Sequence, residues 1–244
     1  GEAKPSRYTD QFSLAVLLFH LFMIAHPLLG KRESSIKCWD IHAQDMLYGT
    51  HPVFIYDPGD DSNRPDPAVH GNAIAYWKVY PQELKDLFTE SFTTGLFEPN
   101  RRVTEKRWMD AAANLMCGVR RCPKCGAEVF YDEAKAEKGH VCWNCKSPVP
   151  MAGVLQIGKR RLLIQPDARL FSHQISGNYD MQTVVGTMVW NPKNPSLLGL
   201  RNDSRENWTY LKADGAQVPV APGRSAAIVR GAGIDFGLKK GEFR

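Results

Sequence analysis

The 244-residue chain lacks an apolar run long enough to cross a bilayer. Its most apolar stretch, residues 12–24, is shorter than the roughly 20 residues that a membrane-spanning helix needs. Asp10 and His20 also fit a secretory signal poorly. We therefore predict no membrane segment, and we interpret residues 10–25 as a core helix that ends at His26-Pro27.

Long runs of like charge, internal repeats and low-complexity tracts are also missing. The formal net charge of +5 is small for 31 basic and 26 acidic residues, so the composition gives no strong case for nucleic-acid binding. Apolar residues make up 43% of the chain and charged residues 23%, as in ordinary globular domains. The length allows about one to three domains.

Cysteine is scarce, but four of the six cysteines form a regular pattern. Cys122, Cys125, Cys142 and Cys145 follow the spacing C-x2-C-x16-C-x2-C. This spacing predicts a tetrathiolate Zn²⁺ site, which would be structural and not catalytic because four protein ligands leave no open position. A pair of disulfides and a redox dithiol are the alternatives. Reduced, zinc-binding cysteines favour the cytoplasm.

The two cysteine turns differ at the residue that follows each second cysteine. Gly126 suits the left-handed backbone that such a turn requires, whereas Lys146 occupies the matching place in the second turn and is less favourable there. Cys38 and Cys117 stand outside the pattern, and we interpret them as plain thiols.

The pattern along the chain predicts an α+β multidomain protein in three parts. Residues 1–117 favour helices, with candidates at 40–47, 81–92 and 104–115, and residues 118–150 form a zinc ribbon. Residues 151–244 show short apolar runs at 161–164, 184–190, 208–211, 217–220, 226–229 and 234–236. Turn signals separate these runs, for example at Asn191-Pro, Asn194-Pro and Asp214-Gly, which is typical of an antiparallel β-sandwich.

Two stretches of the helical part resemble the last third of a protein kinase. They are DQFSLAVLLFHLF from Asp10, followed by HPLLG, and EPNRRVTE from Glu98. The resemblance implies that the first stretch is the central buried helix of the large lobe and that Asp10 binds the backbone of the catalytic loop. It also implies that Arg102 is the arginine that pairs with a glutamate of the activation segment. Glu2 lies too close to Asp10 to be that glutamate, so Arg102 needs another acceptor.

The chain has none of the motifs with which kinases hold ATP, Mg²⁺ or the substrate hydroxyl: no glycine-rich loop, strand lysine, H-R-D-x-x-x-x-N or D-F-G segment that fits. We therefore expect no phosphoryl transfer by this chain, although its parent protein would be a serine/threonine kinase. The alternative is an unrelated helical domain with a fortuitous apolar stripe.

The order of parts, a kinase-lobe tail, a four-cysteine unit with Cys142-Trp-Asn-Cys145, and a β-rich end, resembles the C-terminal region of bacterial kinases of the tellurite-resistance triad. The resemblance implies a scaffold that binds a von Willebrand factor A protein, TerY, and works with a metal-dependent protein phosphatase. Such a partner presents a metal ion that takes an acidic side chain. The candidate donors are Asp57, Asp60, Asp61 and Asp66, which are alternatively only turn residues.

The β-rich end also resembles a forkhead-associated domain, through Val218–Ile228 and Gly231–Gly237. That family binds phosphothreonine through loop residues, for which Lys159, Ser172, His173 and Asn202 are imperfect matches. We expect a sandwich without that site, and we expect His173 to be a hydrogen-bonded structural residue. A phosphopeptide-binding module and a zinc-ribbon nucleic-acid binder are the alternative functions. For the latter, basic residues cluster at 120–121 and 159–161 but have few aromatic neighbours.

Overall fold

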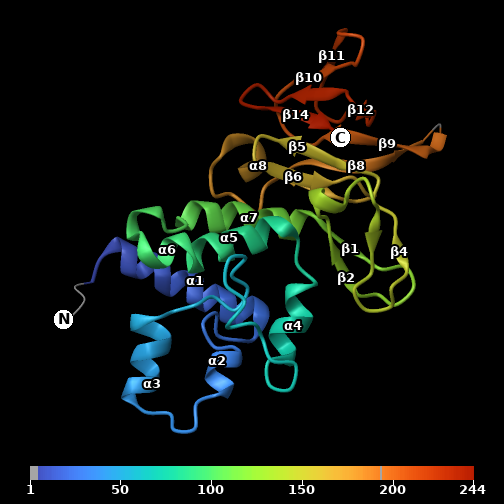
Figure 1. Ribbon diagram of the computed structural model, residues 1–244. Coiled ribbons are helices and arrows are strands. Elements are labelled where there is room, and N and C mark those ends of the chain that lie inside the picture. Colours follow the sequence, from blue (N-terminus) through green and yellow to red (C-terminus); the bar gives the residue numbers. More distant parts are fainter. Residues whose placement is uncertain (1–4, 193) are drawn as a thin grey trace. The chain divides into compact units, whose positions relative to one another are not determined.

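The computed structural model describes residues 5–192 and 194–244, and it divides into two compact units (Figure 1). The first contains residues up to Ala111 together with Asp132–Ala134. The second contains Ala112–Tyr131 and Lys135–Arg244. The boundary between the two units falls between Ala111 and Ala112, within one helix. The three-part division at residues 117 and 150 stays a prediction.

The first unit is mainly helical. Its helices are α1 (Arg7–Met23), α2 (Lys31–Ser34), α3 (Ile41–Asp45), the π-helix η1 (Met46–Thr50), α4 (Gly71–Trp77), α5 (Gln82–Phe92), α6 (Thr94–Phe97), the 3₁₀-helix η2 (Pro99–Arg101) and most of α7 (Glu105–Cys117). A short 3₁₀-helix, η3 (Glu133–Lys135), lies later in the chain. Among the described residues, no helix is long and apolar enough to span a membrane.

Helix α1 begins three residues before the predicted start and ends before the predicted stop. Ser6 caps it, because its side chain accepts from the backbone N–H of Thr9 while the Thr9 hydroxyl accepts from the backbone N–H of Ser6. The helix ends at Met23 because Ile24 adopts a left-handed conformation (φ 50°). The prediction that His26-Pro27 ends the helix was therefore wrong, since the chain has already left the helix there.

Aromatic side chains form the centre of the first unit. Phe19 of α1 is fully buried, and its ring contacts Phe54 at 5.7 Å, Phe88 at 5.0 Å and Phe92 at 5.8 Å between centroids. All three contacts are edge-to-face, which is a favoured arrangement worth about 0.5–1.5 kcal/mol per pair beyond burial. Phe54 lies in the irregular segment between η1 and α4, so this segment supplies part of the core.

The second unit is mainly β-structure. The cysteine segment contains two small antiparallel hairpins, β1 (Val119–Arg121) with β2 (Glu128–Phe130), and β3 (His140–Val141) with β4 (Pro148–Val149). A six-stranded sheet has the order β11 (Gln217–Val220), β10 (Trp208–Leu211), β13 (Gly233–Asp235), β14 (Lys240–Phe243), β5 (Val154–Ile157), β6 (Arg160–Leu163). A four-stranded sheet has the order β12 (Ser225–Ala227), β9 (Asn194–Asn202), β8 (Val184–Asn191), β7 (Arg169–Phe171), and the short helix α8 (Ser172–Ser176) follows β7.

Both sheets contribute to one apolar core. Leu155, Trp208 and Ile234 from the six-stranded sheet share a buried cluster with Met188 and Leu200 from the four-stranded sheet. Every strand pairing is antiparallel. The predicted antiparallel β-rich end is therefore present.

The end of α7 is fastened to the β-structure inside the second unit. The side chain of Asn114 donates to the carbonyl of Lys159 at 3.0 Å and accepts from the N–H of Arg161 at 3.1 Å. Gln165 donates to the carbonyl of Val119 at 3.2 Å. These bonds join the end of α7, the first cysteine hairpin and the six-stranded sheet, and so hold the cysteine segment against the β-rich end.

Candidate metal centre

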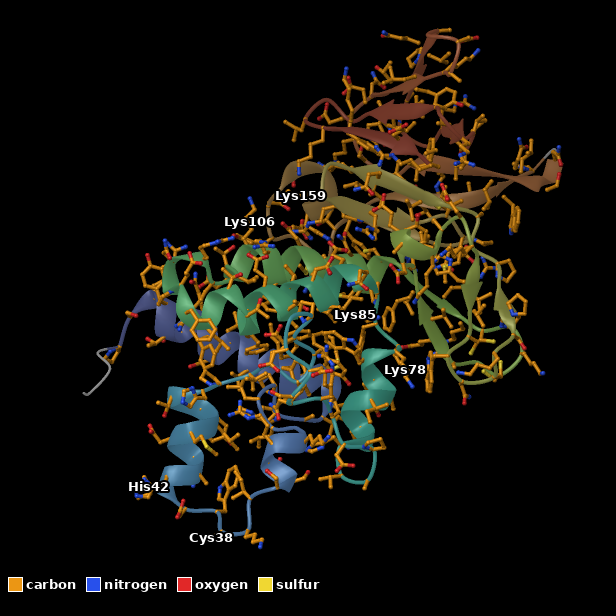
Figure 2. All side chains as sticks on the ribbon, viewed as in Figure 1. Cys38, His42, Lys78, Lys85, Lys106 and Lys159 are labelled. Atoms are coloured by element: carbon orange, nitrogen blue, oxygen red, sulfur yellow. The ribbon has the colours of Figure 1, made fainter. Side chains whose placement is uncertain are left out.

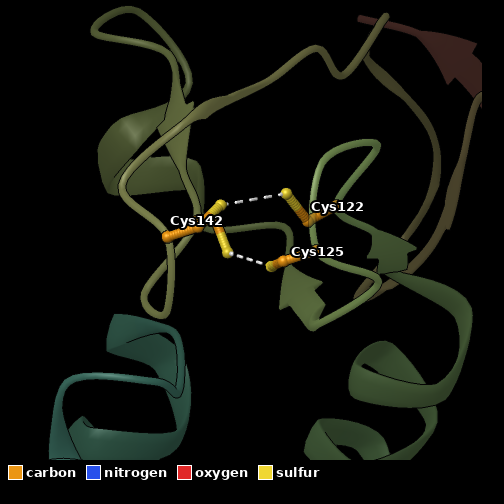
Figure 3. Close-up of side chains that lie close together, drawn as sticks. Cys122, Cys125 and Cys142 are labelled. Atoms are coloured by element: carbon orange, nitrogen blue, oxygen red, sulfur yellow. Dashed lines mark hydrogen bonds between the residues drawn. The ribbon is translucent and has the colours of Figure 1, made fainter.

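The four patterned cysteines lie together at the tips of the two small hairpins (Figure 3). Their sulfur atoms all lie within 4.8 Å of one another. The Sγ atoms of Cys122 and Cys145 are 3.6 Å apart, as are those of Cys125 and Cys142. Each close pair therefore joins one hairpin to the other.

Each cysteine turn is closed by its own backbone. The N–H of Cys122 donates to the carbonyl of Ala127 at 2.8 Å, and the N–H of Gly126 donates to the carbonyl of Cys122 at 2.9 Å. The second turn repeats this scheme at Cys142, with bonds of 2.9 and 3.0 Å. Repetition of one turn brings two sulfurs from each hairpin to a common point, which is how C-x-x-C turns supply two ligands each.

The residue after each second cysteine has the predicted left-handed backbone. Gly126 has φ 74° and Lys146 has φ 59°. Only glycine adopts this conformation without steric cost, so the second turn is strained. The Nζ of Lys146 donates to the carbonyl of Trp143 at 2.5 Å, which partly offsets the strain.

The sulfurs differ in environment. Cys122 and Cys142 are buried, Cys145 is half-buried and Cys125 is exposed. Hydrogen bonds from Ser147 lower the pKa of the Cys145 thiol to about 6, which favours the thiolate that metals bind. At Cys142 the N–H of Cys145 also favours the thiolate, but burial and the neighbouring sulfurs outweigh it and raise the pKa to about 11. A divalent cation at the centre would remove this competition between the sulfurs.

The arrangement fits a tetrahedral metal ion. Thiolates at about 2.3 Å from Zn²⁺ stand about 3.8 Å apart along each tetrahedral edge, close to the 3.6 Å of the two cross-hairpin pairs. Beyond the cysteines, the buried apolar cluster of this segment has only Val129 and Val149. So small a core gives the segment little reason to fold without a cross-link or a metal.

Two residues between the cysteines support the cluster and were not singled out from the sequence. The Asn144 amide lies 3.7 Å from the Sγ of Cys125 as a donor, and the Trp143 indole N–H donates to the carbonyl of Glu128 at 2.9 Å. Their place inside the second C-x-x-C turn was the available signal, because ligand turns often donate to the sulfurs of the neighbouring turn.

The four candidate aspartates do not converge. The carboxylate of Asp57 accepts from the N–H of Gly59, that of Asp60 from Ser62, and that of Asp66 from Ala68, each at 2.8–2.9 Å. Hydrogen bonding to Ser62 lowers the pKa of Asp60. These three residues each cap a local turn. Across residues 5–192 and 194–244, the only cluster of His, Cys, Asp or Glu with metal-binding spacing is the cysteine cluster.

The two residues compared with kinase residues, Asp10 and Arg102, differ from each other in exposure. Asp10 is exposed on α1. Arg102 is half-buried and finds backbone acceptors: its Nε donates to the carbonyl of Gly95 at 2.8 Å and one terminal nitrogen to that of Tyr8 at 2.6 Å. Arg102 therefore has two backbone acceptors, and its comparison with a kinase arginine stays a prediction.

Two of the residues compared with a phosphopeptide site, Ser172 and Asn202, form hydrogen bonds within the β-rich part. Asn202 is fully buried, and its amide donates to the carbonyls of Glu206 and Val220 while its oxygen accepts from the N–H and hydroxyl of Ser204. Ser172 binds within α8 and its following loop. His173 is buried, yet neither ring nitrogen has a hydrogen-bond partner. The prediction of a hydrogen-bonded side chain at His173 was wrong.

The remaining thiols lie outside the cluster. Cys38 is exposed on the loop between α2 and α3 (Figure 2), and Cys117 packs against the core of the second unit, where burial raises the pKa of its thiol. Neither has a second cysteine or a histidine arranged with it as a metal site among the described residues.

Comparison with known proteins identifies no relatives: no protein-family model, curated protein or solved structure matches the chain. The fold and the site together define a mixed α/β protein with several antiparallel sheets and a four-cysteine cluster of metal-binding geometry.

Proposed function

We propose that Cys122, Cys125, Cys142 and Cys145 bind one structural Zn²⁺. The observation that carries the proposal is the convergence of four sulfurs within 4.8 Å of one another, from two turns that share one backbone hydrogen-bond scheme. Four thiolates complete a tetrahedral shell, so the ion would hold the two hairpins together and carry out no chemistry. Elemental analysis and thiol alkylation of the purified chain test this: we expect one zinc per molecule and four cluster thiols that are alkylated much faster after chelation than before it. A metal-free protein with four reactive thiols would contradict it.

We propose that the helical unit is the tail of a kinase lobe and that the chain is a non-catalytic region of a bacterial serine/threonine kinase. The spacing of Gln11, Ala15, Phe19 and Met23, all buried, gives α1 one face directed into the unit. Its other face exposes Leu17 (65%) and Leu21 (69%), and Ile24 (56%), which follows the last residue of the helix, is also exposed. Large apolar side chains on the open face of a helix support a role as the central helix of a larger lobe.

A groove on this face supports the same proposal. It has a volume of about 430 Å³ and is lined by Phe12, Ser13, Val16, Leu17, His20, His26, Leu28 and Tyr48. In a complete lobe, upstream kinase segments would cover it. A full-length parent protein carrying Leu17→Gln, at a residue that lines the groove, should then lose several degrees of melting temperature, whereas this chain with the same substitution should melt unchanged. Equal loss in both would contradict the proposal.

The absence of nucleotide-binding and catalytic motifs leads us to propose that this chain does not transfer phosphate. A phosphotransfer assay with labelled ATP on the purified chain should give background counts. Labelling above background that persists in a preparation cleared of other kinases would overturn the proposal.

We propose that the region acts as a scaffold for a von Willebrand factor A protein of the TerY type in a tellurite-resistance phosphorylation system that also includes a metal-dependent phosphatase. Of the four acidic candidates, Asp61 is exposed and its carboxylate makes no hydrogen bond within the described residues, so it is the one best able to reach a partner's metal ion. Asp61→Asn should weaken binding in calorimetry at least tenfold, and Asp57→Asn serves as the matched control because its carboxylate is already engaged at Gly59. Equal affinity of both variants and the parent would rule out the metal bridge.

Pull-down of the purified chain with the protein encoded beside it, with and without a chelator, tests the scaffold itself. We expect capture that is lost when zinc is removed, because zinc would hold the cysteine segment in shape. Capture that is indifferent to chelation would separate the interaction from the zinc site.

We propose that the β-rich end is a forkhead-associated-like sandwich without phosphothreonine binding. Two antiparallel sheets around one core support the architecture. Both the nitrogen and the oxygen of the Asn202 amide are hydrogen-bonded within the protein, which argues against contact of this side chain with a ligand. Fluorescence anisotropy with a phosphothreonine peptide library should show no binding stronger than that of the unphosphorylated library.

A further inference from the structure

The four sulfurs of the cysteine cluster are unequally protected. Cys122 is 3% exposed and Cys142 is 0% exposed, whereas Cys125 lies open to solvent. Gly126, which follows Cys125, has no atom within 4 Å of the place where a β-carbon would stand, so that side of the turn is empty space. A small solute can therefore reach Cys125 most easily, because Cys122 and Cys142 are buried and Cys145 is half-buried.

The exposed sulfur has a close partner on the opposite hairpin. Its Sγ lies 3.6 Å from that of Cys142, and the remaining two sulfurs, of Cys122 and Cys145, also lie 3.6 Å apart across the hairpins (Figure 3). A disulfide needs sulfurs about 2.05 Å apart, so each pair has to close by roughly 1.6 Å. Both pairs can close together because they use different sulfurs.

We propose that the four-cysteine site is also an oxidation site that opens at Cys125 and closes as two cross-hairpin disulfides, Cys125–Cys142 and Cys122–Cys145, with release of the metal. This inference rests on the proposed zinc site. The oxidant is a peroxide, and hydrogen peroxide is the probe that represents this class.

Each disulfide forms in two balanced steps. The Cys125 thiolate attacks one oxygen of hydrogen peroxide, so that an S–O bond forms, the O–O bond breaks, and the departing hydroxide takes a proton to give water. The Cys142 thiolate then attacks the resulting sulfenic sulfur, the S–S bond forms, the S–O bond breaks, and hydroxide again leaves as water after taking a proton. Two thiolates lose two electrons and one peroxide becomes two waters. A metal left with two ligands dissociates, and the second pair reacts in the same way.

Cross-hairpin pairing keeps the two hairpins joined after the metal has left. Disulfides inside each C-x-x-C turn would instead leave the hairpins joined by weaker contacts alone: the hydrogen bond from the Trp143 indole to the carbonyl of Glu128, the stacked rings of Tyr131 and His140, and the small apolar cluster around Val129 and Val149. The oxidised segment therefore keeps its hairpin arrangement, and a thiol reductant followed by zinc restores the original site.

The test uses the 244-residue chain with the substitutions Cys38→Ser and Cys117→Ser, so that only the four cluster cysteines remain. The zinc-loaded protein is treated with up to two equivalents of hydrogen peroxide while released zinc is followed with a chromogenic chelator. Trypsin cuts after Lys124 and separates Cys122 from Cys125, and chymotrypsin cuts after Trp143 and separates Cys142 from Cys145. Mass spectrometry of the double digest then assigns every disulfide.

We expect release of the bound zinc, both cross-hairpin disulfides, and recovery of zinc binding after reduction. With limiting peroxide and a sulfenic-acid trap, we expect the label on Cys125 first. Disulfides within either turn, irreversible sulfinic acids, retention of zinc, or first labelling of any cluster cysteine other than Cys125 would overturn the inference while leaving the zinc site intact. A preparation that holds no zinc before peroxide is added would overturn the proposed zinc site itself.

Discussion

The guanidinium of Arg102 donates a 2.6 Å hydrogen bond to the backbone carbonyl of Tyr8, 94 residues earlier in the chain. A second bond, from its Nε to the carbonyl of Gly95, and the ring of Phe12 at 5.1 Å complete its surroundings. One side chain thus joins the start of α1 to the segment that leads into α7. Burial lowers the pKa of Arg102 without removing its charge, so both bonds are charge-assisted.

Replacing Arg102 by lysine should therefore destabilise the helical unit by about 2 kcal/mol, because an ammonium group cannot reach both carbonyls in the fork geometry. Chemical denaturation followed by circular dichroism measures the change. Arg101→Lys is the matched control, since Arg101 is 60% exposed and makes only a 3.5 Å surface pair with Glu98. Equal destabilisation by both substitutions would contradict the assigned role.

Removing one cluster cysteine should unfold the cysteine segment. Cys122→Ser deletes a buried ligand, and we expect loss of zinc and of the chemical-shift dispersion of residues 119–149 in nuclear magnetic resonance spectra. Cys38→Ser changes an exposed thiol and should leave zinc content and spectra unchanged. A folded, zinc-containing Cys122→Ser protein would show that three sulfurs suffice.

The two cysteine turns should respond oppositely to exchange of the residue after the second cysteine. Gly126→Ala places a β-carbon on a backbone at φ 74° and should weaken zinc binding by about 1 kcal/mol. Lys146→Gly relieves the backbone strain at φ 59° and should strengthen zinc binding by about 0.5–1 kcal/mol. The gain is reduced because the substitution also removes the hydrogen bond from the Lys146 Nζ to the carbonyl of Trp143. Competition for zinc with a chromophoric chelator measures both effects, and a gain for Gly126→Ala would be the wrong sign.

The helical unit should lose stability in mild acid through His26. Burial, with the nearby His20 as the smaller cause, lowers the pKa of His26 to about 4. The unfolded state, with a pKa near 6.5, binds the proton first, so stability is complete above pH 6.5 and falls as the pH decreases toward 4. After allowance for partial solvent exposure, we expect a loss of about 1–2 kcal/mol over this range.

The matched variant for this prediction is His26→Asn. The ring Nδ1 of His26 accepts from the N–H of Leu28 at 3.1 Å, and an asparagine oxygen offers a similar acceptor that does not titrate. Urea unfolding at pH 4, 5, 6 and 7 should show a flatter pH dependence in the variant. Parallel curves for both proteins would place the acid sensitivity elsewhere.

His173 should be replaceable by leucine without loss of stability. Its imidazole is buried and both ring nitrogens lack partners, so a side chain of similar volume without polar atoms removes a desolvation cost. We expect a change between zero and about 1 kcal/mol in favour of the variant. A marked drop in melting temperature would show that the imidazole makes a favourable interaction in solution.

The sequence predicted those features that depend on local pattern. The cysteine spacing identified the four residues that converge, since two identical turns with a fixed offset leave few other arrangements. Periodicity located α5 at Gln82–Phe92, and apolar runs located β8 and β10 within about one residue. The ends of α1 were missed because the capping box at Ser6 and the left-handed Ile24 act through single residues and not through a period.

Features that depend on distant contacts were not predictable in this way. Strand β9 starts at Asn194, which had been assigned to a turn, because the pairing of Asn194 with Asn191 of β8 outweighs its local preference. Strands β5 and β7 are short and do not alternate cleanly, and β14 alternates in burial only because a glycine and a phenylalanine occupy its buried positions, so the pairing partners of all three define them. The missing partners of His173 arise from the surrounding fold, and its flanking residues give no sign of them.

The pairing of β5 with β14 near the middle of the six-stranded sheet has a further consequence. Val154 and Arg244 exchange two backbone hydrogen bonds of 3.0 and 2.9 Å, so β14 fixes the start of β5. Removal of β14 would leave backbone groups of β5 without partners inside the sheet. The last strand of the described chain therefore also secures the strand by which the chain enters the six-stranded sheet.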